Sequence, residues 1–342
     1  MKNILFLITK SEIGGAQKWV KEQVVICSSR FNCFMATNSN GWLIEDFNPD
    51  KVLVDNGIES RFSLIYLNNL AQFVKRHKID LIVASSANAG LYARMMKLIL
   101  SKRIKIIYVS HGWSALYNSV RLKFFYIMVE RLLSFLSDSI ICVSENDFKK
   151  AISEIGISRK KLALIRNSIL PIKYDQASKS NHKIKILSVG RFSKPKRFDL
   201  LVESVKNCDV ELHLIGSGPQ MDTIKKIAPD NVRFHGEIKN FNNFIDYDIF
   251  CLISDSEGLP LAAIEAMSCG LPLVLSNVGG CAELINGNGF LTHNDPIDIK
   301  KSISLVLTNR NALGKQSLSV FQDGFNLSLK QHEYIEFYKK YL

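Results

Sequence analysis

The stretch "IFCLISDSEGLPLAAIEAMSCGLPLVLS", residues 249–276, spells a strand, a turn, a helix and a second strand in close succession. Residues 249–253 are apolar throughout, which predicts a strand buried on both faces. Pro260 suits the first position of a helix, and Gly270 suits its end. Residues 273–276 form a second apolar run. The stretch therefore predicts a βαβ unit, from which parallel sheets are built.

The same alternation of short apolar runs and longer helical stretches extends along the chain in both directions. Further strands are predicted at residues 3–8, 33–37, 81–84, 104–109, 140–143, 184–189, 210–215 and 232–234, and helices at 18–28, 64–77, 88–100, 121–135, 198–207, 220–227 and 297–307. Because the strand runs are apolar throughout, helices should cover both faces of each sheet. The predicted fold class is α/β, with doubly wound, Rossmann-like sheets.

A chain of 342 residues is too long for one ordinary domain, and a polar stretch at residues 173–183 separates two series of strands. We therefore predict an N-terminal domain at residues 1–172 and a C-terminal domain at 173–325. Residues 326–342 are expected to form a helix that crosses back to the N-terminal domain. Ligands of doubly wound sheets bind beyond the carboxyl ends of the strands, so residues that follow strands are the candidate site residues.

Cysteine usage and hydropathy together predict a cytoplasmic protein. The seven cysteines are odd in number, lie mostly in apolar runs and never show C-x-x-C spacing, which indicates buried, reduced thiols without a zinc site. Residues 4–8 are the only apolar run near the N-terminus, too short for a signal peptide. No apolar stretch approaches the ~18 residues that a spanning helix needs.

The formal charge of +12 is concentrated in the first half of the chain. Residues 1–170 hold 24 Lys and Arg against 13 Asp and Glu, whereas residues 171–342 hold 20 against 19. Residues 81–129 contain no acid and include apolar stretches flanked by cations. We expect this segment to contact an anionic membrane surface, as in a peripheral protein on the inner face of the plasma membrane. The alternative is that these stretches are ordinary helices covering the sheet.

Two glutamates, Glu257 and Glu265, lie on either side of the predicted helix start at Pro260. Glu257 precedes the helix, beside backbone N–H groups that can receive a phosphate. Glu265 lies among alanines, whose small side chains let a ligand approach closely. Ionised carboxylates at these positions would accept hydrogen bonds from sugar hydroxyls. The alternative is a surface helix with two exposed glutamates.

A basic turn, "GRFSKPKR", follows the strand at residues 184–189. Arg191 adjoins a buried strand, where an unpaired guanidinium would be costly. A diphosphate would satisfy both the forked donors of Arg191 and the ammonium of Lys196. The alternative is a solvated loop, which is the usual setting for a cluster of charges.

Glycines and a histidine follow other strands. Gly14 and Gly15 precede a helix in "SEIGGAQKWV", and Gly216 ends a strand in "LIGSGP", so a ligand could approach the backbone at both places. In "YVSHGW", His111 stands at the end of a strand, where it is either structural or part of a site.

Five motifs in chain order, "GGAQKWV", "SHGW", "VGRFSKPKRFDLL", "LIGSGP" and "EGLPLAAIEAMSCGLPLVLSNVGGCAELI", together resemble the retaining glycosyltransferases of family 4. The resemblance is strongest over residues 184–291. It implies the GT-B fold, in which two Rossmann-like domains face each other across a cleft. It also implies transfer of a sugar from a nucleotide-sugar donor, most often a UDP-sugar, to a saccharide or a polyprenyl-diphosphate-linked acceptor in bacterial surface polysaccharide synthesis.

The resemblance assigns the donor site to the C-terminal domain. Glu257 would meet hydroxyls of the transferred sugar, and Glu265 those of the ribose. Arg191 and Lys196 would hold the diphosphate, although the Lys-Gly of the family is Lys196-Arg197 here. Backbone close to the donor would come from Gly190, Gly216, Gly258, Leu259 and Leu261.

In the N-terminal domain, the resemblance implies that His111 reaches the donor sugar. Gly14 and Gly15 would form a loop near the diphosphate and the acceptor. In the C-terminal domain, the backbone at residues 236–238 would border the base.

The implied chemistry requires no cofactor and no metal. Fixed cations and a helix N-terminus would stabilise the charge that develops on the departing diphosphate in an oxocarbenium-like transition state. Retention would follow from front-face attack, in which the leaving phosphate helps to take the acceptor proton. Asp246 and Asp248 spell D-x-D, a metal-binding spacing in another glycosyltransferase fold, but they begin a buried strand and are predicted to be structural.

Two other functions fit parts of the sequence. A nucleotide-sugar epimerase with the GT-B shape would release an altered donor without any acceptor. A basic nucleic-acid-binding protein would use the positively charged first half, but it would need exposed aromatics interleaved with cations, and we expect no nucleic-acid partner. A nicotinamide-dependent dehydrogenase is disfavoured because no G-x-G-x-x-G follows the first strand.

Overall fold

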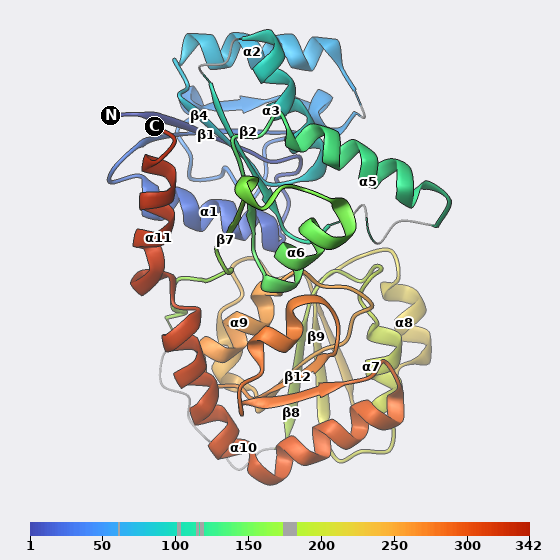
Figure 1. Cartoon of the computed structure of the whole chain (residues 1–342). Coiled ribbons are helices and arrows are strands. Elements are labelled where there is room, and N and C mark those ends of the chain that lie inside the picture. The colour runs from blue at the N-terminus through green and yellow to red at the C-terminus, as the bar shows by residue number, and fades with distance from the viewer. Residues whose placement is uncertain (61, 101–103, 114–115, 117–119, 174–182) are drawn as a thin grey trace. The chain divides into compact units, whose positions relative to one another are not determined.

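A computed structural model of the chain describes residues 1–60, 62–100, 104–113, 116, 120–173 and 183–342. It divides into two compact units (Figure 1), the first comprising Met1–Asn167 with Lys330–Leu342 and the second Ser168–Leu329. Most of the predicted polar linker, at residues 174–182, lies outside the described residues.

The first unit is built on a seven-stranded parallel sheet with the order β3-β2-β1-β4-β5-β6-β7. Its strands are β1 (Asn3–Leu7), β2 (Asn32–Thr37), β3 (Val52–Val54), β4 (Leu81–Ala84), β5 (Lys105–Ser110), β6 (Ser139–Cys142) and β7 (Leu162–Leu164). Leu5 pairs with Phe34 on one side and with Ile82 on the other. The strand order reverses between β1 and β4, so the loops that follow these two strands form the expected ligand-binding edge of this sheet.

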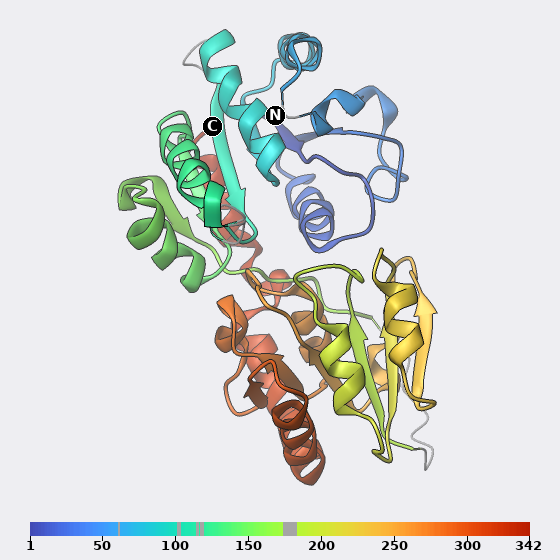
Figure 2. The ribbon, with the colours of Figure 1, turned by 90° about the vertical axis from the view of Figure 1, so that its right-hand side faces the viewer.

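Helices cover the first sheet on both faces (Figure 2). They are α1 (Gly15–Cys27), α2 (Leu64–Arg76), α3 (Ala87–Ile99), α5 (Val120–Ser134), α6 (Glu145–Lys150) and α11 (Leu327–Lys339), with short helical turns at Pro49–Lys51, Asn56–Glu59, Ala151–Ile155 and Arg159–Lys161. Leu5 and Leu7 pack into the core formed with α2 and α3. Phe6, on the opposite face of β1, packs edge-on against Tyr338 of α11. This alternation follows from the two-residue period of a strand.

The second unit is built on a six-stranded parallel sheet with the order β10-β9-β8-β11-β12-β13. Its strands are β8 (Lys185–Val189), β9 (Glu211–Ile215), β10 (Val232–Gly236), β11 (Ile249–Leu252), β12 (Leu273–Ser276) and β13 (Gly289–Thr292). Phe250 pairs with Leu187 and with Leu273, so β11 lies between β8 and β12. The strand order reverses between β8 and β11, which makes the loops after these two strands the expected site.

The helices of the second unit are α7 (Phe198–Ser204), α8 (Met221–Ile227), α9 (Leu261–Ser268) and α10 (Pro296–Gly324), with short turns at Asn243–Asp246 and Gly279–Leu284. One core contains Ile186 and Ile249 from the sheet together with Leu201 of α7 and Ile303 of α10. Helix α10 starts at a capping residue, Asp295, whose carboxylate accepts hydrogen bonds from the backbone of the first turn.

The predicted doubly wound α/β class is confirmed, and each predicted strand is present with ends shifted by at most two residues. Three strands were not predicted: β3, β7 and β13. All three are short strands at sheet edges, where most of their residues are only partly buried or exposed. Helix α10 continues past the predicted end at residue 307, through a non-helical Asn309, to Gly324.

All seven cysteines are free, and each except Cys208 is buried. Burial raises the pKa of the Cys33 thiol to about 12 and raises the pKa of Cys142 and Cys251 further, so these groups stay protonated and unreactive. Within the part of the chain that the structure describes, no helix is both long and apolar enough to cross a bilayer.

Candidate functional site

Two loops meet at the point where the strand order of the second sheet reverses. The loop after β8 and the loop after β11 are joined by an antiparallel bridge between Lys196 and Ser254. The backbone N–H of Asp255 donates to the carbonyl of Pro195 at 2.9 Å, and the N–H of Arg197 donates to the carbonyl of Ile253 at the same distance. These bonds fix the basic turn of the first loop against the acidic turn of the second.

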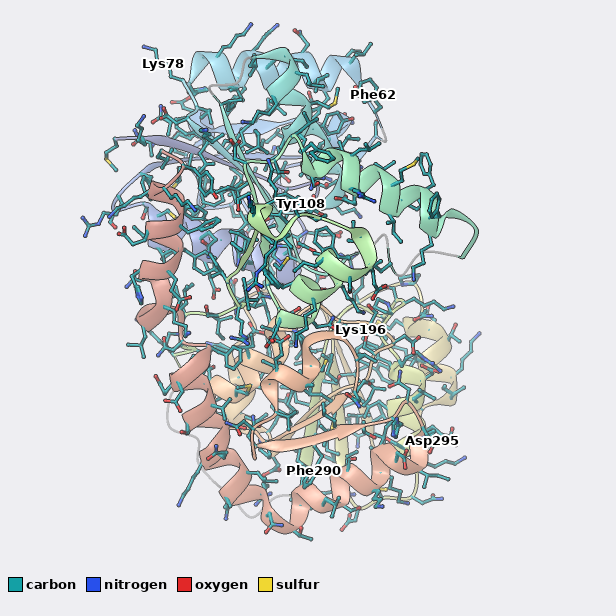
Figure 3. The ribbon with its side chains drawn as sticks, viewed as in Figure 1. Phe62, Lys78, Tyr108, Lys196, Phe290 and Asp295 are labelled. Carbon is teal, nitrogen blue, oxygen red and sulfur yellow. The ribbon has the colours of Figure 1, made fainter. Side chains whose placement is uncertain are left out.

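This pairing brings Lys196 and Glu257 into direct contact (Figure 3 labels Lys196). The Lys196 Nζ atom lies 2.5 Å from the Glu257 Oε1 atom. Their side chains are only 19% and 11% exposed, so water screens this ion pair weakly. Each charge is compensated by the other in a partly desolvated position, where a lone charge would be costly. Thus a cation and a carboxylate predicted to bind different parts of one ligand are neighbours.

The backbone of Glu257 is held by two glycines that follow β12. Gly279 has a φ of +53°, and a Cβ atom there would lie 1.8 Å from the carbonyl oxygen of Glu257. The N–H of Gly280 donates to the carbonyl of Gly258 at 2.8 Å. Only glycine fits at position 279, for both conformation and space. The sequence analysis gave these residues no role, although two adjacent glycines after a strand are a usable signal for close backbone approach.

Glycines also join the loops that follow β8 and β9. Gly216 has a φ of +135°, and a Cβ atom there would lie 1.9 Å from the carbonyl oxygen of Gly190. The N–H of Gly190 donates to the carbonyl of Ile215, and the N–H of Phe192 donates to that of Ser217, so the parallel ladder continues beyond both strands. Gly216 therefore lets two backbones meet, and its lack of a side chain is needed for packing.

Arg191 projects from this extended segment into solvent, so the expectation that it is desolvated is wrong. Phe192 is fully buried, and successive residues of an extended chain point to opposite sides. The burial of Phe192 therefore turns the Arg191 guanidinium outward at the carboxyl end of the sheet.

Arg197, the residue that departs from the family pattern, has carboxylate partners in the protein itself. Its Nε and Nη2 atoms donate to the two oxygens of Asp199 at 3.0 and 2.7 Å, and its Nη1 atom donates to Asp255 at 3.3 Å. This bidentate pairing lowers the pKa of Asp199. Arg197 thus links the two loops, and Lys196 is the cation that contacts Glu257.

Helix α9 buries most of its residues, and neither predicted glutamate is exposed. Glu265 is partly buried, with Ala263 and Ala266 fully buried beside it. The alternative of a surface helix with two exposed glutamates is therefore wrong. Three further predicted residues, Gly258, Leu259 and Leu261, are buried around the first turn of the helix. The first hydrogen bonds of α9 run from the N–H groups of Ala263 and Ile264 to the Pro260 carbonyl, so the N–H groups of Leu261 and Ala262 precede them, next to the loop that carries Glu257.

Asp248 of the D-x-D tripeptide takes part in structural hydrogen bonds at the start of β11. Its Oδ2 atom accepts from the backbone N–H of Lys185 at 2.9 Å, and its Oδ1 atom accepts from Arg310 Nη1 at 2.6 Å. The start of a strand lies at the edge of the sheet opposite to the two loops described above.

In the first unit, His111 follows β5 and packs against Trp19 of α1, with ring centroids 5.3 Å apart and the rings nearly perpendicular. Its Nε2 atom is buried and has no hydrogen-bond partner among the described residues. Burial lowers the pKa of His111 to about 4, so the imidazole is neutral at pH 7. Trp19 Nε1 donates to the hydroxyl of Tyr334 in α11 at 3.2 Å, which fixes the indole behind His111.

Gly14 and Gly15 stand at the start of α1, where the N–H of Lys18 donates to the Gly14 carbonyl at 2.9 Å. The preceding loop is tied to the loop after β4, because the hydroxyls of Thr9 and Ser86 lie 2.6 Å apart. This contact marks the reversal of strand order in the first sheet, and the sequence analysis did not identify it. Gly14, Gly15 and His111 belong to the first unit, and the other predicted residues belong to the second.

Comparison with known proteins places the chain among the glycosyltransferases. The family "Glycosyltransferase Family 4" matches residues 23–170, and "Glycosyl transferases group 1" matches residues 172–318. The chain is 43% identical over 324 residues to the O-antigen biosynthesis glycosyltransferase WbnH of Escherichia coli, an alignment that covers 93% of this chain and 94% of the relative. It is 24% identical over 294 residues to the E. coli UDP-Gal:alpha-D-GlcNAc-diphosphoundecaprenol alpha-1,3-galactosyltransferase, covering 76% and 75%.

Among solved structures, Anabaena Alr3699/HepE in complex with UDP-glucose superimposes with a TM-score of 0.86 at 18% identity, over 99% of this chain and all of the other. This likeness concerns the fold, and with the two parallel-sheet units it confirms the predicted GT-B class. The extent of the 43% identity and the two consecutive family matches decide the family. The chain belongs to the family 4 glycosyltransferases, and its activity is glycosyl transfer.

Proposed function

We propose that the protein transfers a sugar from a UDP-sugar, with retention of configuration, to a saccharide acceptor carried on a polyprenyl diphosphate. The product would be part of a bacterial surface polysaccharide. The names of two relatives support this proposal: one is an O-antigen biosynthesis glycosyltransferase, and the other is named for UDP-galactose and a diphosphoundecaprenol-linked acceptor.

The contact between Lys196 and Glu257 carries the proposal. A nucleotide-sugar has its diphosphate directly attached to the anomeric carbon. Its binding site therefore needs a cation for the phosphate beside a group that accepts hydrogen bonds from the sugar hydroxyls. Lys196 and Glu257 provide these two groups 2.5 Å apart. The ammonium has three donors, so it can bind a phosphate oxygen while it still pairs with the carboxylate. Glu257, as an acceptor, would receive hydrogen bonds from the sugar.

The surrounding groups extend the donor site along the diphosphate and the nucleoside. Arg191 presents an exposed guanidinium at the end of β8, and the start of α9 presents backbone N–H groups, both of which favour phosphate. Glu265 in α9 would bind the ribose hydroxyls. The N–H of Gly216 donates to the carbonyl of Gly236 at 2.7 Å, so the turn predicted to border the base adjoins the diphosphate loop.

Fixed positive groups would accelerate the reaction by stabilising the leaving group. Negative charge grows on the departing diphosphate as its bond to the sugar breaks. Lys196, Arg191 and the start of α9 would therefore stabilise the transition state more than they stabilise the bound donor in its ground state. His111 is neutral at pH 7, so it would contribute a hydrogen bond to the donor sugar and no charge. Because Asp248 is engaged with Lys185 and Arg310, we propose that these cations act without a metal ion.

A lipid-linked acceptor lies at a membrane surface, so we propose that the protein acts there as a peripheral protein on the cytoplasmic side. The excess of positive charge in residues 1–170 supports contact with anionic lipid.

Thermal shift measurements against a panel of nucleotides and nucleotide-sugars test the donor. A ligand present at 100 times its Kd stabilises a protein by about 2.7 kcal/mol. We expect UDP and one UDP-sugar to raise the Tm of the wild type and to raise that of the Lys196→Met variant much less. Stabilisation by GDP compounds alone would overturn the UDP assignment, and an equal response of both proteins would overturn the site.

Product analysis tests the reaction. With donor and a lipid-linked acceptor present, we expect a glycosylated lipid whose new bond has the anomeric configuration of the donor. Inversion would contradict the retaining mechanism. Conversion of the donor to an altered nucleotide-sugar without any acceptor would instead indicate an epimerase.

A further inference from the structure

Helix α5, labelled in Figure 1, carries several large apolar side chains that are exposed to solvent. The exposed fractions of its large apolar residues are 79% for Phe124, 53% for Phe125, 43% for Met128 and 59% for Leu132, and that of the adjoining Phe135 is 71%. Single exposed apolar residues are common on protein surfaces, but five within twelve positions, four of them in one helix, need an explanation.

The five residues share one side of the helix. At ~100° per residue they fall within an arc of about 100°, which is the width of the apolar face of an amphipathic helix. The opposite side faces the protein, because Ser134 is buried, Ile127 packs against the core, and Glu130 pairs with the buried Arg94 at 3.1 Å. The outward face of α5 is therefore its more apolar face, which is the reverse of an ordinary surface helix.

The charges on α5 are arranged for an anionic partner. The exposed Arg131 lies at the border of the apolar arc. Lys123 lies on the side of the helix that faces the protein, where its Nζ atom pairs with Glu154 Oε2 at 3.9 Å. Glu130 is the only acid between residues 120 and 137, and its carboxylate is directed inward to Arg94. The outward arc thus combines apolar side chains with positive charge and carries no carboxylate.

The structure also narrows the set of residues that could contact a membrane within the expected segment, residues 81–129. In α3, Tyr92, Arg94 and Met96 are fully buried, and Lys97 pairs with Asp138 at 2.5 Å. Most of α3 is therefore a helix that covers the sheet, as the alternative interpretation of this segment predicts. Lys102 and Arg103 lie outside the described residues, as does the side chain of Arg121. At the end of α3, Leu98 and Ile99 are 63% and 46% exposed, and the exposed apolar face of α5 runs from Phe124 beyond residue 129 to Phe135.

We propose that α5 is a docking helix that lies in the interface of an anionic bilayer, with Phe124, Phe125, Met128, Leu132 and Phe135 inserted among the lipids. This inference rests on the proposed function, in which the acceptor is a membrane lipid. Apolar burial would supply most of the affinity, and attraction between Arg131 and anionic headgroups would add to it.

A bilayer fits this surface better than a second copy of the chain does. In an isologous dimer the same patch of each copy meets the other. The positively charged first halves of the two chains would then face and repel each other. Residues 1–170 hold 24 basic against 13 acidic residues. An anionic membrane has the complementary sign.

Vesicle flotation tests the proposal with the full-length protein. The wild type should bind vesicles of phosphatidylglycerol and phosphatidylethanolamine strongly and vesicles of phosphatidylcholine weakly. Replacing two rings, in the Phe124→Gln/Phe135→Gln variant, should lower the partition coefficient about tenfold or more, because each ring contributes a large buried apolar area. The matched control is Ile227→Gln/Ile297→Gln, which removes two residues of the second unit that are 53% and 77% exposed; its partition should equal that of the wild type.

Three results would overturn the proposal. These are failure of the wild type to bind anionic vesicles, equal binding by the α5 variant, and a wild-type dimer in analytical ultracentrifugation that the α5 variant converts to a monomer. Transfer to a short-chain, water-soluble acceptor separates this proposal from the proposed function. The α5 variant should keep wild-type activity in that assay and lose it on vesicle-embedded acceptor, whereas an inactive wild type in both assays would contradict the proposed function instead.

Discussion

The Nζ atom of Lys196 lies 2.5 Å from the Oε1 atom of Glu257, although 61 positions separate the two residues in the sequence. Each side chain is mostly shielded from water, so removing either one leaves its partner as an uncompensated charge. The Lys196–Glu257 pair is neutral overall in the free protein. In the proposed function it has a second, separable role, in which Lys196 binds the phosphate of the donor and Glu257 accepts hydrogen bonds from the sugar.

The Lys196→Met substitution should separate these roles. We expect kcat/KM to fall by roughly 10²- to 10³-fold, the usual effect of removing one fixed group that stabilises a developing charge. Stability should fall by about 1–3 kcal/mol, because the Glu257 carboxylate loses its partner. The double variant Lys196→Met/Glu257→Gln should recover most of the stability and none of the activity. Lys194→Met, an exposed cation of the same loop, is the control and should behave as the wild type in denaturant titrations and kinetics.

The opposite pattern would count against the pair as a donor site. If the double variant regained activity together with stability, Lys196 and Glu257 would only hold the two loops together.

The Gly279→Ala substitution tests how the Glu257 loop is positioned. A Cβ atom at this position would lie 1.8 Å from the Glu257 carbonyl oxygen, and the φ of +53° is unfavourable for alanine. The loop must therefore move, which should lower stability by about 1–3 kcal/mol and weaken donor binding at least tenfold. Calorimetric titration with the donor and thermal denaturation measure the two effects.

Gly324→Ala is the matched control, because a Cβ atom there would meet no other atom within 4 Å. If both variants bound the donor as the wild type does, the packing of Gly279 against Glu257 would not position the site.

The Arg197→Gln substitution should affect stability and leave the donor affinity unchanged. Arg197 pairs with Asp199 and Asp255 at the protein surface, so its loss should cost about 1 kcal/mol or less. The pairing lowers the pKa of Asp199 below its ordinary value of 3.8, so its contribution is present at neutral pH and is lost as the pH falls through that lowered value. Denaturant titrations at pH 7 and at pH 3 should thus show a difference between wild type and variant that shrinks in acid. A large rise in the donor Kd would instead assign Arg197 to the phosphate site.

The pH dependence of stability tests the environment of His111. Burial lowers its pKa to about 4, below its ordinary value of 6.5. Between these values the unfolded chain binds a proton that the folded protein does not, so the free energy of unfolding should decrease as the pH falls from 6.5 toward 4. The His111→Gln variant should lose part of this slope, and His293→Gln, at an exposed position, should keep it. Identical slopes in wild type and His111→Gln would show that His111 titrates normally.

Much of the architecture could be predicted from the sequence because it depends on local pattern. Apolar runs and turn residues located ten of the strands, and their uniform apolarity indicated sheets covered on both faces. Edge strands such as β3 and β13 were missed because they are short and most of their residues are only partly buried, whereas the predicted four-residue strands, such as β4 and β12, are buried throughout. The motifs likewise pointed to one family, since five of them occur in register along the chain.

The sequence by itself determined the α/β class, the family and the residue types available for binding a nucleotide-sugar, because these follow from neighbours along the chain. Only the tertiary structure decided which of these residues meet. The reversal of strand order between β8 and β11 brings two loops together, pairs Lys196 with Glu257 and assigns Arg197 to Asp199. Exposure was also a tertiary result: Arg191 and the apolar face of α5 point to solvent because their neighbours fill the core, and no local pattern specifies which side of a segment the rest of the protein will cover.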